Sequence, residues 1–238
     1  MRLDQLLQSQ GFGSRNECRR MIECGRVSVG DAGIIRDPDT EIVLERARFV
    51  IDGVEFIYQR HVYIVLNKPA DFECSHRPER YPSVFSLLPP DLVRRGVQAV
   101  GRLDSDTTGL LLLSDDGQFI HALSSPKKAV PKCYEVIARH SVPDTQLEQL
   151  EAGVVLRDDP QPAKAISCER VSETIVRMSV TEGRYHLVKR MIAATGNRVE
   201  QLRRVAIGGF QLPSSLAPGE WRWLESDELQ LLGWKASE

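Results

Sequence analysis

The segment GRLDSDTTGLLLLSDDG, residues 101–117, holds the densest group of polar side chains in the chain. Its four consecutive leucines, residues 110–113, predict a buried strand. Residues 105–109 predict a tight turn, because hydroxyl side chains and glycine stabilise turns through local hydrogen bonds. Residues 97–103 predict a second strand that leads into Asp104. We therefore expect Asp104 at the end of a buried strand, fixed in place and partly removed from water.

The residues alone leave two interpretations of Asp104 and Asp106 open. In the first, both carboxylates only cap the turn. In the second, they form the acid–base pair of a glycosidase, an enzyme that needs its carboxylates ~5 Å or ~6.5–9.5 Å apart. Nothing in the sequence fixes such a separation, and a turn would scatter the two side chains.

Outward from this segment, the chain predicts a unit that covers residues 59–238. Apolar runs predict strands at residues 62–66, 133–138 and 174–181, and residues 67–69 are expected to end the first. Helical patterns at residues 143–152 and 186–195 are each followed by a glycine. Because strands and helices do not alternate regularly, we expect an α+β fold with a mixed, largely antiparallel sheet.

Residues 1–58 predict a smaller α/β unit. Leucines at helical spacing predict a first helix, and Ser14 with Glu17 forms a capping box that starts a second. Residues 27–29 and 34–35 predict a hairpin across a glycine-containing turn. Residues 44–60 predict a connector with a strand or two. Two small helices and a hairpin suit a recognition module.

Charge is unevenly distributed, although the net charge of the chain is only −2. Residues 183–204 contain six basic residues and one acid, and residues 1–26 contain five arginines. Such segregation can leave one positive face on a nearly neutral protein, which would suit nucleic acid. The alternative is two solvated helix faces.

Composition and missing motifs exclude several classes of protein. With 42% hydrophobic and 27% charged residues, the chain predicts an ordinary globular protein. No apolar run approaches the ~20 residues that cross a bilayer, and the charged N-terminus is unlike a signal peptide, so we expect a cytoplasmic location. Five scattered cysteines predict free thiols, and the five histidines lack metal-ligand spacing. Phosphate-binding and dinucleotide-binding glycine motifs are absent, so we expect no cofactor and no metal.

Several motifs together resemble the RsuA/RluB/E/F family of pseudouridine synthases. The segment quoted first resembles the motif in which the Asp after Arg-Leu is the nucleophile, here Asp104. KCYEV, residues 132–136, resembles the active-site tyrosine segment, with Tyr134. EGRYHLVKRM, residues 182–191, resembles the motif that places a basic residue, here Lys189, against that Asp. Residues 1–31 resemble the S4 RNA-binding module that precedes the catalytic domain.

The resemblance implies an S4-like module at residues 1–58 and a catalytic domain at residues 59–238. It implies isomerisation of uridine to pseudouridine in ribosomal RNA. The Lys189-Arg190 pair is most similar to members that modify 16S rRNA of the small subunit. The alternatives are a 23S rRNA enzyme of the same family, a non-catalytic rRNA-binding or ribosome-assembly protein, and a hydrolase of small glycosides.

The implied chemistry assigns roles to several residues. Asp104 would attack C1′ of the ribose or C6 of the uracil, or remove a proton from C2′. Lys189 would keep Asp104 ionised, because a nearby opposite charge favours the charged form. Tyr134 would pack against the flipped uracil, and Arg102 would fill the space that the base leaves. The isomerisation needs no external group, which agrees with the expectation of no cofactor.

The partner implied by these motifs is ribosomal RNA, 16S rRNA above all, either free or in an assembling small subunit. We expect the protein to be a monomer. The residues expected to contact RNA are Arg2, Ser14, Arg15, Arg19, Arg26, Arg102, Arg184 and Arg190.

Overall fold

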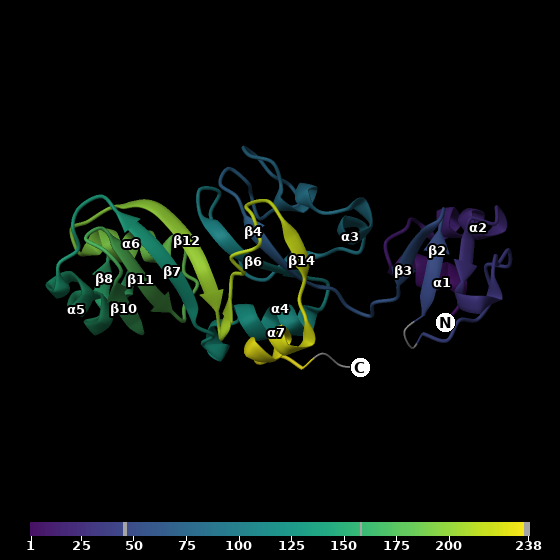
Figure 1. Ribbon diagram of the computed structural model, residues 1–238. Helices are drawn as coiled ribbons and strands as arrows, with labels where there is room; N and C mark the ends of the chain where they lie inside the picture. Colours follow the sequence, from purple (N-terminus) through teal and green to yellow (C-terminus); the bar gives the residue numbers. More distant parts are fainter. Residues whose placement is uncertain (45–46, 158, 236–238) are drawn as a thin grey trace. The chain divides into compact units, whose positions relative to one another are not determined.

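The computed structural model describes residues 1–44, 47–157 and 159–235, and the chain forms two compact units (Figure 1). The N-terminal unit contains the described residues of 1–62 together with Leu88–Val97. The second unit contains residues 63–87 and the described residues of 98–235. None of the described helices combines the length and the apolar character needed to cross a membrane.

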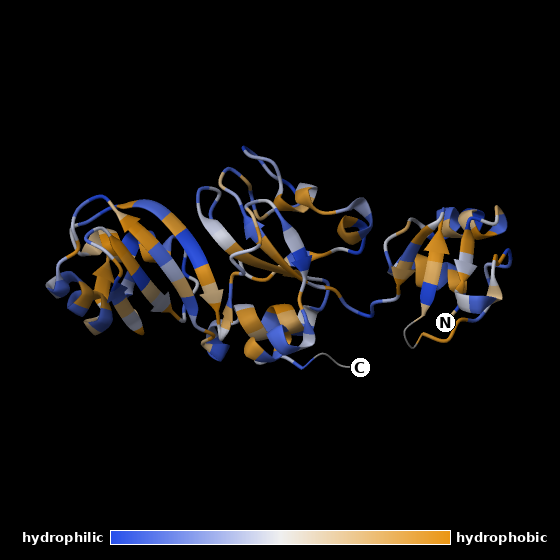
Figure 2. Cartoon of the chain, viewed as in Figure 1, coloured by the Kyte–Doolittle hydropathy of each residue, from blue (hydrophilic) through white to orange (hydrophobic). Residues whose placement is uncertain are grey.

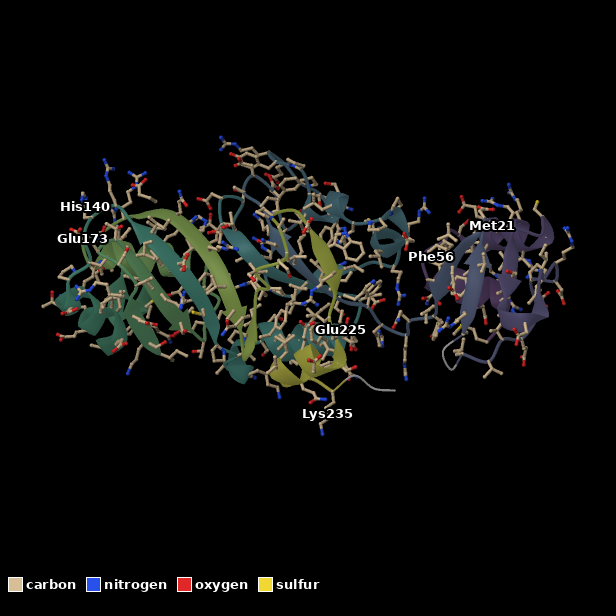
Figure 3. The ribbon with its side chains drawn as sticks, in the orientation of Figure 1. Met21, Phe56, His140, Glu173, Glu225 and Lys235 are labelled. Carbon is tan, nitrogen blue, oxygen red and sulfur yellow. The ribbon has the colours of Figure 1, made fainter. Side chains whose placement is uncertain are left out.

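The N-terminal unit combines helices with a three-stranded antiparallel sheet in the order β1-β2-β3. Its elements are α1 (Leu3–Ser9), α2 (Arg15–Glu23), β1 (Val27–Val29), the 3-10 turn η1 (Gly30–Ala32), β2 (Arg48–Ile51), β3 (Val54–Ile57) and α3 (Pro90–Arg94). Leucines of α1 and Cys18 and Ile22 of α2 share a buried core with Phe49 and Ile51 of β2. Met21 and Phe56, labelled in Figure 3, pack against this core.

The predicted capping box of α2 is confirmed. The Ser14 side chain accepts a hydrogen bond from the Glu17 backbone N–H, and the Ser14 N–H donates to Glu17 Oε2 over 2.7 Å. Two otherwise free backbone donors at the start of the helix are thereby satisfied. Ser14 therefore has a structural task in the start of α2.

The prediction of a hairpin between residues 27–29 and 34–35 is only partly right. Ile34 forms a single bridge with Ser28, whereas the strand partner of β1 is β2, with Val27 opposite Ile51. The segment predicted as a connector supplies β2 and β3, joined at Asp52 and Gly53, both with positive φ (51° and 85°). Such a two-residue turn favours Asp-Gly, because positive φ at both positions matches the twist of the strands. The strand order of this sheet depends on pairing between distant segments, which the local sequence pattern does not reveal.

The segment Leu88–Val97 joins the N-terminal unit from a distant part of the chain. Arg95 donates through Nη1 to Gln10 Oε1 over 3.0 Å and through Nη2 to the Gln59 carbonyl over 2.9 Å. Gly11 has a φ of +84°, and an added Cβ there would lie 2.0 Å from the Asp91 carbonyl oxygen. Only glycine fits this close approach.

The second unit contains nine strands, among the described residues, in one mixed sheet along the path β10-β11-β7-β12-β6-β4-β14, with β5 and β13 as side branches. Its strands are β4 (Tyr63–Lys68), β5 (Gln98–Ala99), β6 (Thr108–Ser114), β7 (Lys132–Ala138), β10 (Ser167–Arg170), β11 (Ile175–Val180), β12 (Val199–Ile207), β13 (Phe210–Gln211) and β14 (Trp221–Trp223), with β8 (Val154–Leu156) and β9 (Asp159–Ala163) as a separate pair. Its helices are α4 (Gly117–Ser124), α5 (Asp144–Ala152), α6 (Leu187–Ala194) and α7 (Ser226–Leu231), with 3-10 turns η2 (Val84–Leu87) and η3 (Pro126–Lys128).

The sheet is largely antiparallel, as predicted, and β6–β12 is the parallel pair among the described strands. At this junction Gly109 has a φ of +97°, and an added Cβ would lie 2.3 Å from the Arg204 carbonyl oxygen. The glycine of the quoted motif therefore permits the two strands to meet at the middle of the sheet.

Two buried clusters hold the sheet together. One lies between α6 and the strands β7, β11 and β12, and it includes Met191 and Ile192. The other joins β4 and β6 to α4 and α7, and it includes Phe119 and Leu229. Figure 2 shows hydrophobic residues concentrated along β4 and β6. All residues of these two strands are buried except Thr108, which is half-buried.

Two strand predictions in this unit need correction. The strand expected at residues 97–103 is reduced to β5, Gln98–Ala99, so residues 100–107 form a loop, here called the Asp104 loop. The break expected at residues 67–69 comes later, because β4 continues through Lys68, which is fully buried. The lysine stays in the strand because its ammonium finds partners inside the protein, described below.

Candidate active site

The Asp104 loop ends in a tight turn. The Thr107 N–H donates to the Asp104 carbonyl over 3.1 Å, which closes a four-residue turn before β6 begins. Lys68 supports this turn from β4: its ammonium donates to the carbonyls of Ser105 and Thr107, each over 2.9 Å, and to Pro69 over 3.0 Å. Burial lowers the pKa of Lys68. A buried cation thus holds in place the backbone that carries Asp104.

The start of α6 faces the same loop. Lys189 Nζ lies 3.2 Å from Asp104 Oδ2 and 2.6 Å from Asp106 Oδ1. His186 Nε2 lies 3.3 Å from Asp104 Oδ1. His186 precedes the helix with a φ of 49°, in the left-handed region, and its ring stacks on Tyr185 at 3.7 Å between centroids. Asp104 therefore has a basic side chain on each carboxylate oxygen.

The charges at this site support one another. Burial would lower the pKa of Lys189, but the carboxylates of Asp106 and Asp104 outweigh it and raise that pKa. Burial would raise the pKa of Asp106, but its hydrogen bond to Lys189 and the charge of Lys189 lower it. Both groups therefore remain ionised at neutral pH. The Lys189 side chain is 24% exposed and that of Asp104 28%, so the site is screened only in part from water.

Asp104 lies where two hollows adjoin. A small cavity of about 70 Å³ is lined by Asp104, Tyr134, Thr107 and apolar residues that include Val180 and Leu187. A groove of about 690 Å³ has a polar lining that includes Asp104, Lys189 and Tyr185. Arg102, Leu103, Asp104 and His186 line both. A planar group in the small cavity would therefore contact Tyr134 on β7 and Asp104 at the entrance.

The structure brings together the three predicted catalytic residues. Asp104 and Lys189 form an ion pair, and Asp104 and Tyr134 line one cavity. Arg102, predicted to fill the space left by a base, borders both hollows.

Arg184 lines the small cavity and Arg190 follows Lys189 in α6, and both have internal partners. Arg184 pairs with Asp159 (2.8 Å) and Glu182 (2.6 Å), and hydrogen bonds to both raise its pKa. Arg190 donates to the Tyr185 carbonyl over 3.2 Å.

The predicted RNA-contacting arginines of the N-terminal unit also have acidic partners. Asp4 is fully buried. Its Oδ2 lies 3.1 Å from Nη2 of Arg2, 3.3 Å from Nε of Arg15 and 3.0 Å from Nη1 of Arg19. Burial would raise the pKa of Asp4, but the hydrogen bonds from these arginines lower it. Arg26 pairs with Asp52, and Arg2 and Arg19 also pair with Asp39. Arg2, Arg15 and Arg19 are thus gathered around Asp4, whereas Arg26 pairs separately with Asp52.

Sequence reasoning missed three contributors to the site: His186, Asp106 as a partner of Lys189, and Lys68. A signal existed for His186: in the helix predicted at residues 186–195 it comes three residues before Lys189, which would place both on one helix face. In the structure His186 lies just before α6 and reaches Asp104 from there. Lys68 had no such signal, since a lysine that follows a strand is ordinarily solvated.

Comparison with known proteins shows which family the chain belongs to. The family model described as RNA pseudouridylate synthase matches residues 62–194, which is more than half of the chain and includes Asp104, Tyr134 and Lys189. The chain belongs to the RNA pseudouridylate synthase family. The S4 domain model matches residues 1–38 of the synthase, where the RNA-binding module was expected.

Relatives of the synthase match along nearly its whole length. An uncharacterized RNA pseudouridine synthase, YtzG, of Bacillus subtilis (strain 168) is 39% identical over 98% of both chains. Ribosomal small subunit pseudouridine synthase A of Escherichia coli (strain K12) is 39% identical over 96% of this chain and 98% of its own. A crystal structure of a pseudouridylate synthase is similar with a TM-score of 0.69 and 32% identity, over 98% of this chain and 99% of that one.

These findings confirm the predicted family, the α+β fold with an N-terminal S4 domain, and the prediction of an RNA-modifying isomerase. They decide against the two alternatives outside the family, a hydrolase of small glycosides and a non-catalytic RNA-binding protein.

Proposed function

We propose that the synthase converts a specific uridine of 16S rRNA to pseudouridine in the cytoplasm, acting as a monomer on free rRNA or on an assembling small subunit. The observation that carries the proposal is the position of Asp104, which borders both the small cavity beside Tyr134 and the groove that holds Lys189. The choice of 16S rRNA is supported by two relatives named ribosomal small subunit pseudouridine synthase A, from Escherichia coli and Salmonella typhimurium, at 39% and 38% identity.

In the proposed reaction, the target uridine leaves its stack and its uracil enters the small cavity. Unstacking costs a few kcal/mol, which stacking and phosphate contacts offset. Tyr134 packs against the base, and Arg102, at the edge of both hollows, occupies the space that the base vacates. The apolar part of the lining excludes water from the base.

Asp104 is the catalytic carboxylate. It acts as nucleophile at C1′ or at C6, or as the base at C2′. The N1–C1′ bond breaks, the uracil turns, and a C5–C1′ bond forms; the proton at C5 is lost and N1 gains one. All atoms of the uridine are retained, so the residues of this chain suffice for the isomerisation. Tyr134 lies in the cavity where the C5 proton has to leave.

Lys189 and His186 position and polarise Asp104. Lys189 supplies a fixed positive charge 3.2 Å from one oxygen, and His186 lies 3.3 Å from the other. A carboxylate with a partner on each oxygen has its plane fixed, which aligns it for attack. Asp106 forms an ion pair with the same Lys189 ammonium and keeps it close to the Asp104 loop.

The N-terminal unit is proposed to locate the substrate. We assign residues 1–58 to an S4-like domain with its linker and residues 59–238 to the catalytic domain. Arg2, Arg15, Arg19 and Arg26 would contact RNA phosphates, and Ser14 the backbone near the start of α2. Phosphate contacts add affinity but no base discrimination, so the choice of uridine falls to the catalytic unit.

Mapping of pseudouridine in ribosomal RNA from cells with and without the gene tests the proposed function. The expected result is the loss of one site in 16S rRNA, restored by the wild-type gene and not by a gene that encodes Asp104→Asn. Loss of a site in 23S rRNA instead would overturn the 16S assignment and favour a large-subunit enzyme of the same family.

A further inference from the structure

The groove beside Asp104 contains arginines that form no ion pair with any described acidic residue. Arg77, Arg80 and Arg102 line it, and none of the carboxylates in the described parts of the chain pairs with them. The arginines of the N-terminal unit differ, because acids already hold them. Unpaired guanidinium groups in a groove that leads to the catalytic carboxylate are available to an anionic ligand.

Arg77 and Arg80 belong to a loop, residues 73–83, that is held together by internal hydrogen bonds and is here called the Glu73 loop. The Glu73 carboxylate accepts hydrogen bonds from the N–H groups of Tyr81 (2.9 Å), Arg80 (2.8 Å) and Glu79 (3.0 Å). These backbone hydrogen bonds lower the pKa of Glu73. The negative charge of Glu73 is thus bound by backbone donors within the loop, and the two guanidinium groups have no ion-pair partner in the described part of the chain.

Further contacts hold the Glu73 loop in one conformation. The Ser83 hydroxyl donates to the Ser75 carbonyl over 2.6 Å, and the Arg77 N–H donates to Ser75 Oγ over 3.0 Å. His76 stacks on Phe85, with 3.7 Å between ring centroids. The Arg80 guanidinium lies over the Tyr81 ring at 5.2 Å. A loop organised before binding loses little entropy when a ligand arrives.

The other side of the groove offers an aromatic face. Tyr185 is 71% exposed, lines the groove and stacks on His186, which contacts Asp104. Cationic side chains combined with exposed aromatic rings are the arrangement that binds single-stranded nucleic acid, because the cations contact phosphates and the rings stack on bases. Because the groove and the small cavity share Asp104, a strand whose uracil enters the cavity can place its neighbouring nucleotides in the groove.

We propose that the Glu73 loop binds the single-stranded RNA that flanks the target uridine, an inference that rests on the proposed function. Arg77 and Arg80 contact phosphates, and Tyr185 stacks on an adjacent base. Glu73 is a positioning residue: it contacts no RNA and acts by holding the backbone that carries the two arginines. The loop contributes affinity and leaves the chemical step to Asp104.

Two measurements on the full-length protein test this inference. The first is binding to a twelve-nucleotide oligouridylate across a salt series. The variant is Arg77→Gln/Arg80→Gln. The matched control, Arg139→Gln/Arg198→Gln, removes the same charge from two exposed arginines that do not line the groove. We expect the variant to bind about tenfold more weakly, with a salt slope smaller by about 1.4, since each phosphate contact on a single strand contributes about 0.7. The control should match the wild type.

The second measurement is single-turnover formation of pseudouridine in a 16S rRNA transcript. The enzyme concentration for half-maximal rate should rise in Arg77→Gln/Arg80→Gln, while the rate at saturating enzyme stays within about twofold of wild type. Glu73→Gln should also raise the enzyme concentration for half-maximal rate, because the side-chain amide cannot accept all three backbone N–H hydrogen bonds. Glu73→Asp should restore part of the affinity.

Unchanged affinity and salt slope in Arg77→Gln/Arg80→Gln would overturn the inference, as would a lower saturating rate with unchanged affinity. Binding to oligouridylate does not depend on turnover, so the inference and the proposed function fail separately. One outcome would separate the two claims. If the wild type forms no pseudouridine in 16S rRNA, but the salt slopes of wild type and Arg77→Gln/Arg80→Gln still differ as expected, the 16S assignment is refuted and the Glu73 loop is still supported as an RNA-binding element.

Discussion

The ammonium nitrogen of Lys189 lies 3.2 Å from Oδ2 of Asp104. The two residues come from distant segments: Asp104 from the loop before β6, and Lys189 from the first turn of α6. The pair forms because α6 packs its buried face on the sheet while its polar side reaches the Asp104 loop. This single contact joins two motifs that are separate in the sequence.

Asp104→Asn is expected to abolish pseudouridine formation while fold and RNA affinity remain close to wild type. The amide keeps the shape of the side chain but loses its charge and its ability to act as nucleophile or base. Single-turnover assays on a 16S rRNA transcript, with unfolding and binding measured alongside, test this. Asp106→Asn is the control in the same loop: its side chain is 67% exposed, and we expect a two- to fivefold loss. Measurable turnover by purified Asp104→Asn would disprove the catalytic role.

Lys189→Met is expected to reduce the rate by roughly 30- to 150-fold, equivalent to about 2–3 kcal/mol for loss of a charged hydrogen-bond partner. Methionine fills the space but leaves Asp104 and Asp106 without their shared cation. Lys189→Arg should recover much of the activity, because a fixed positive charge is the required element. The rate at saturating enzyme is the quantity to compare. Equal defects in both variants would show that the ammonium geometry, and not the charge, matters.

Lys68→Met is expected to impair activity although Lys68 lines neither hollow. Its ammonium holds the carbonyls of Ser105 and Thr107 in the turn that carries Asp104. Loss of these bonds should lower the free energy of unfolding by about 1–3 kcal/mol and misplace Asp104. Urea unfolding and single-turnover rates, measured where the variant is fully folded, separate the two effects. A folded Lys68→Met variant with the wild-type rate would contradict the positioning role.

Lys132 predicts a pH-dependent stability. Burial lowers its pKa to about 8, below the ordinary value of 10.5. Between these values the unfolded chain binds more protons, so raising the pH through this window stabilises the folded state. At pH 7 the buried ammonium is a cost, and Lys132→Met should be more stable than wild type by about 1–3 kcal/mol. The difference should shrink between pH 8 and 10.5. Urea unfolding of both proteins at pH 7, 9 and 10.5 checks it, and a constant difference would be the contrary result.

Arg15→Gln tests the RNA-binding role of the N-terminal unit. The Arg15 side chain is 54% exposed and reaches Asp4 by one contact of 3.3 Å, so it is the least constrained of the three arginines around that acid. We expect weaker binding to a 16S rRNA transcript and a salt slope smaller by about 0.9, by analogy with one duplex phosphate contact. Arg48→Gln, which removes another exposed arginine of the same unit, is the control. Identical slopes in all three proteins would assign the unit a different task.

The local elements and the residues that carry the chemistry could be predicted from the amino-acid sequence alone. The leucine run became β6, the Ser14–Glu17 capping box started α2, and the motifs around Asp104, Tyr134 and Lys189 pointed to one family. Such features were readable because hydrophobic periodicity, capping and turn chemistry act between residues a few positions apart.

Which distant side chains meet could be learned only from the packed three-dimensional structure. It shortened the expected strand before Asp104 to two residues, extended β4 through a buried Lys68, and paired β1 with β2. It also placed Asp4 beside Arg2, Arg15 and Arg19, and it gave Arg77 and Arg80 no acidic partner among the described residues. A charged side chain is solvated, paired or buried according to the segments that pack around it, and those segments lie far away in the chain.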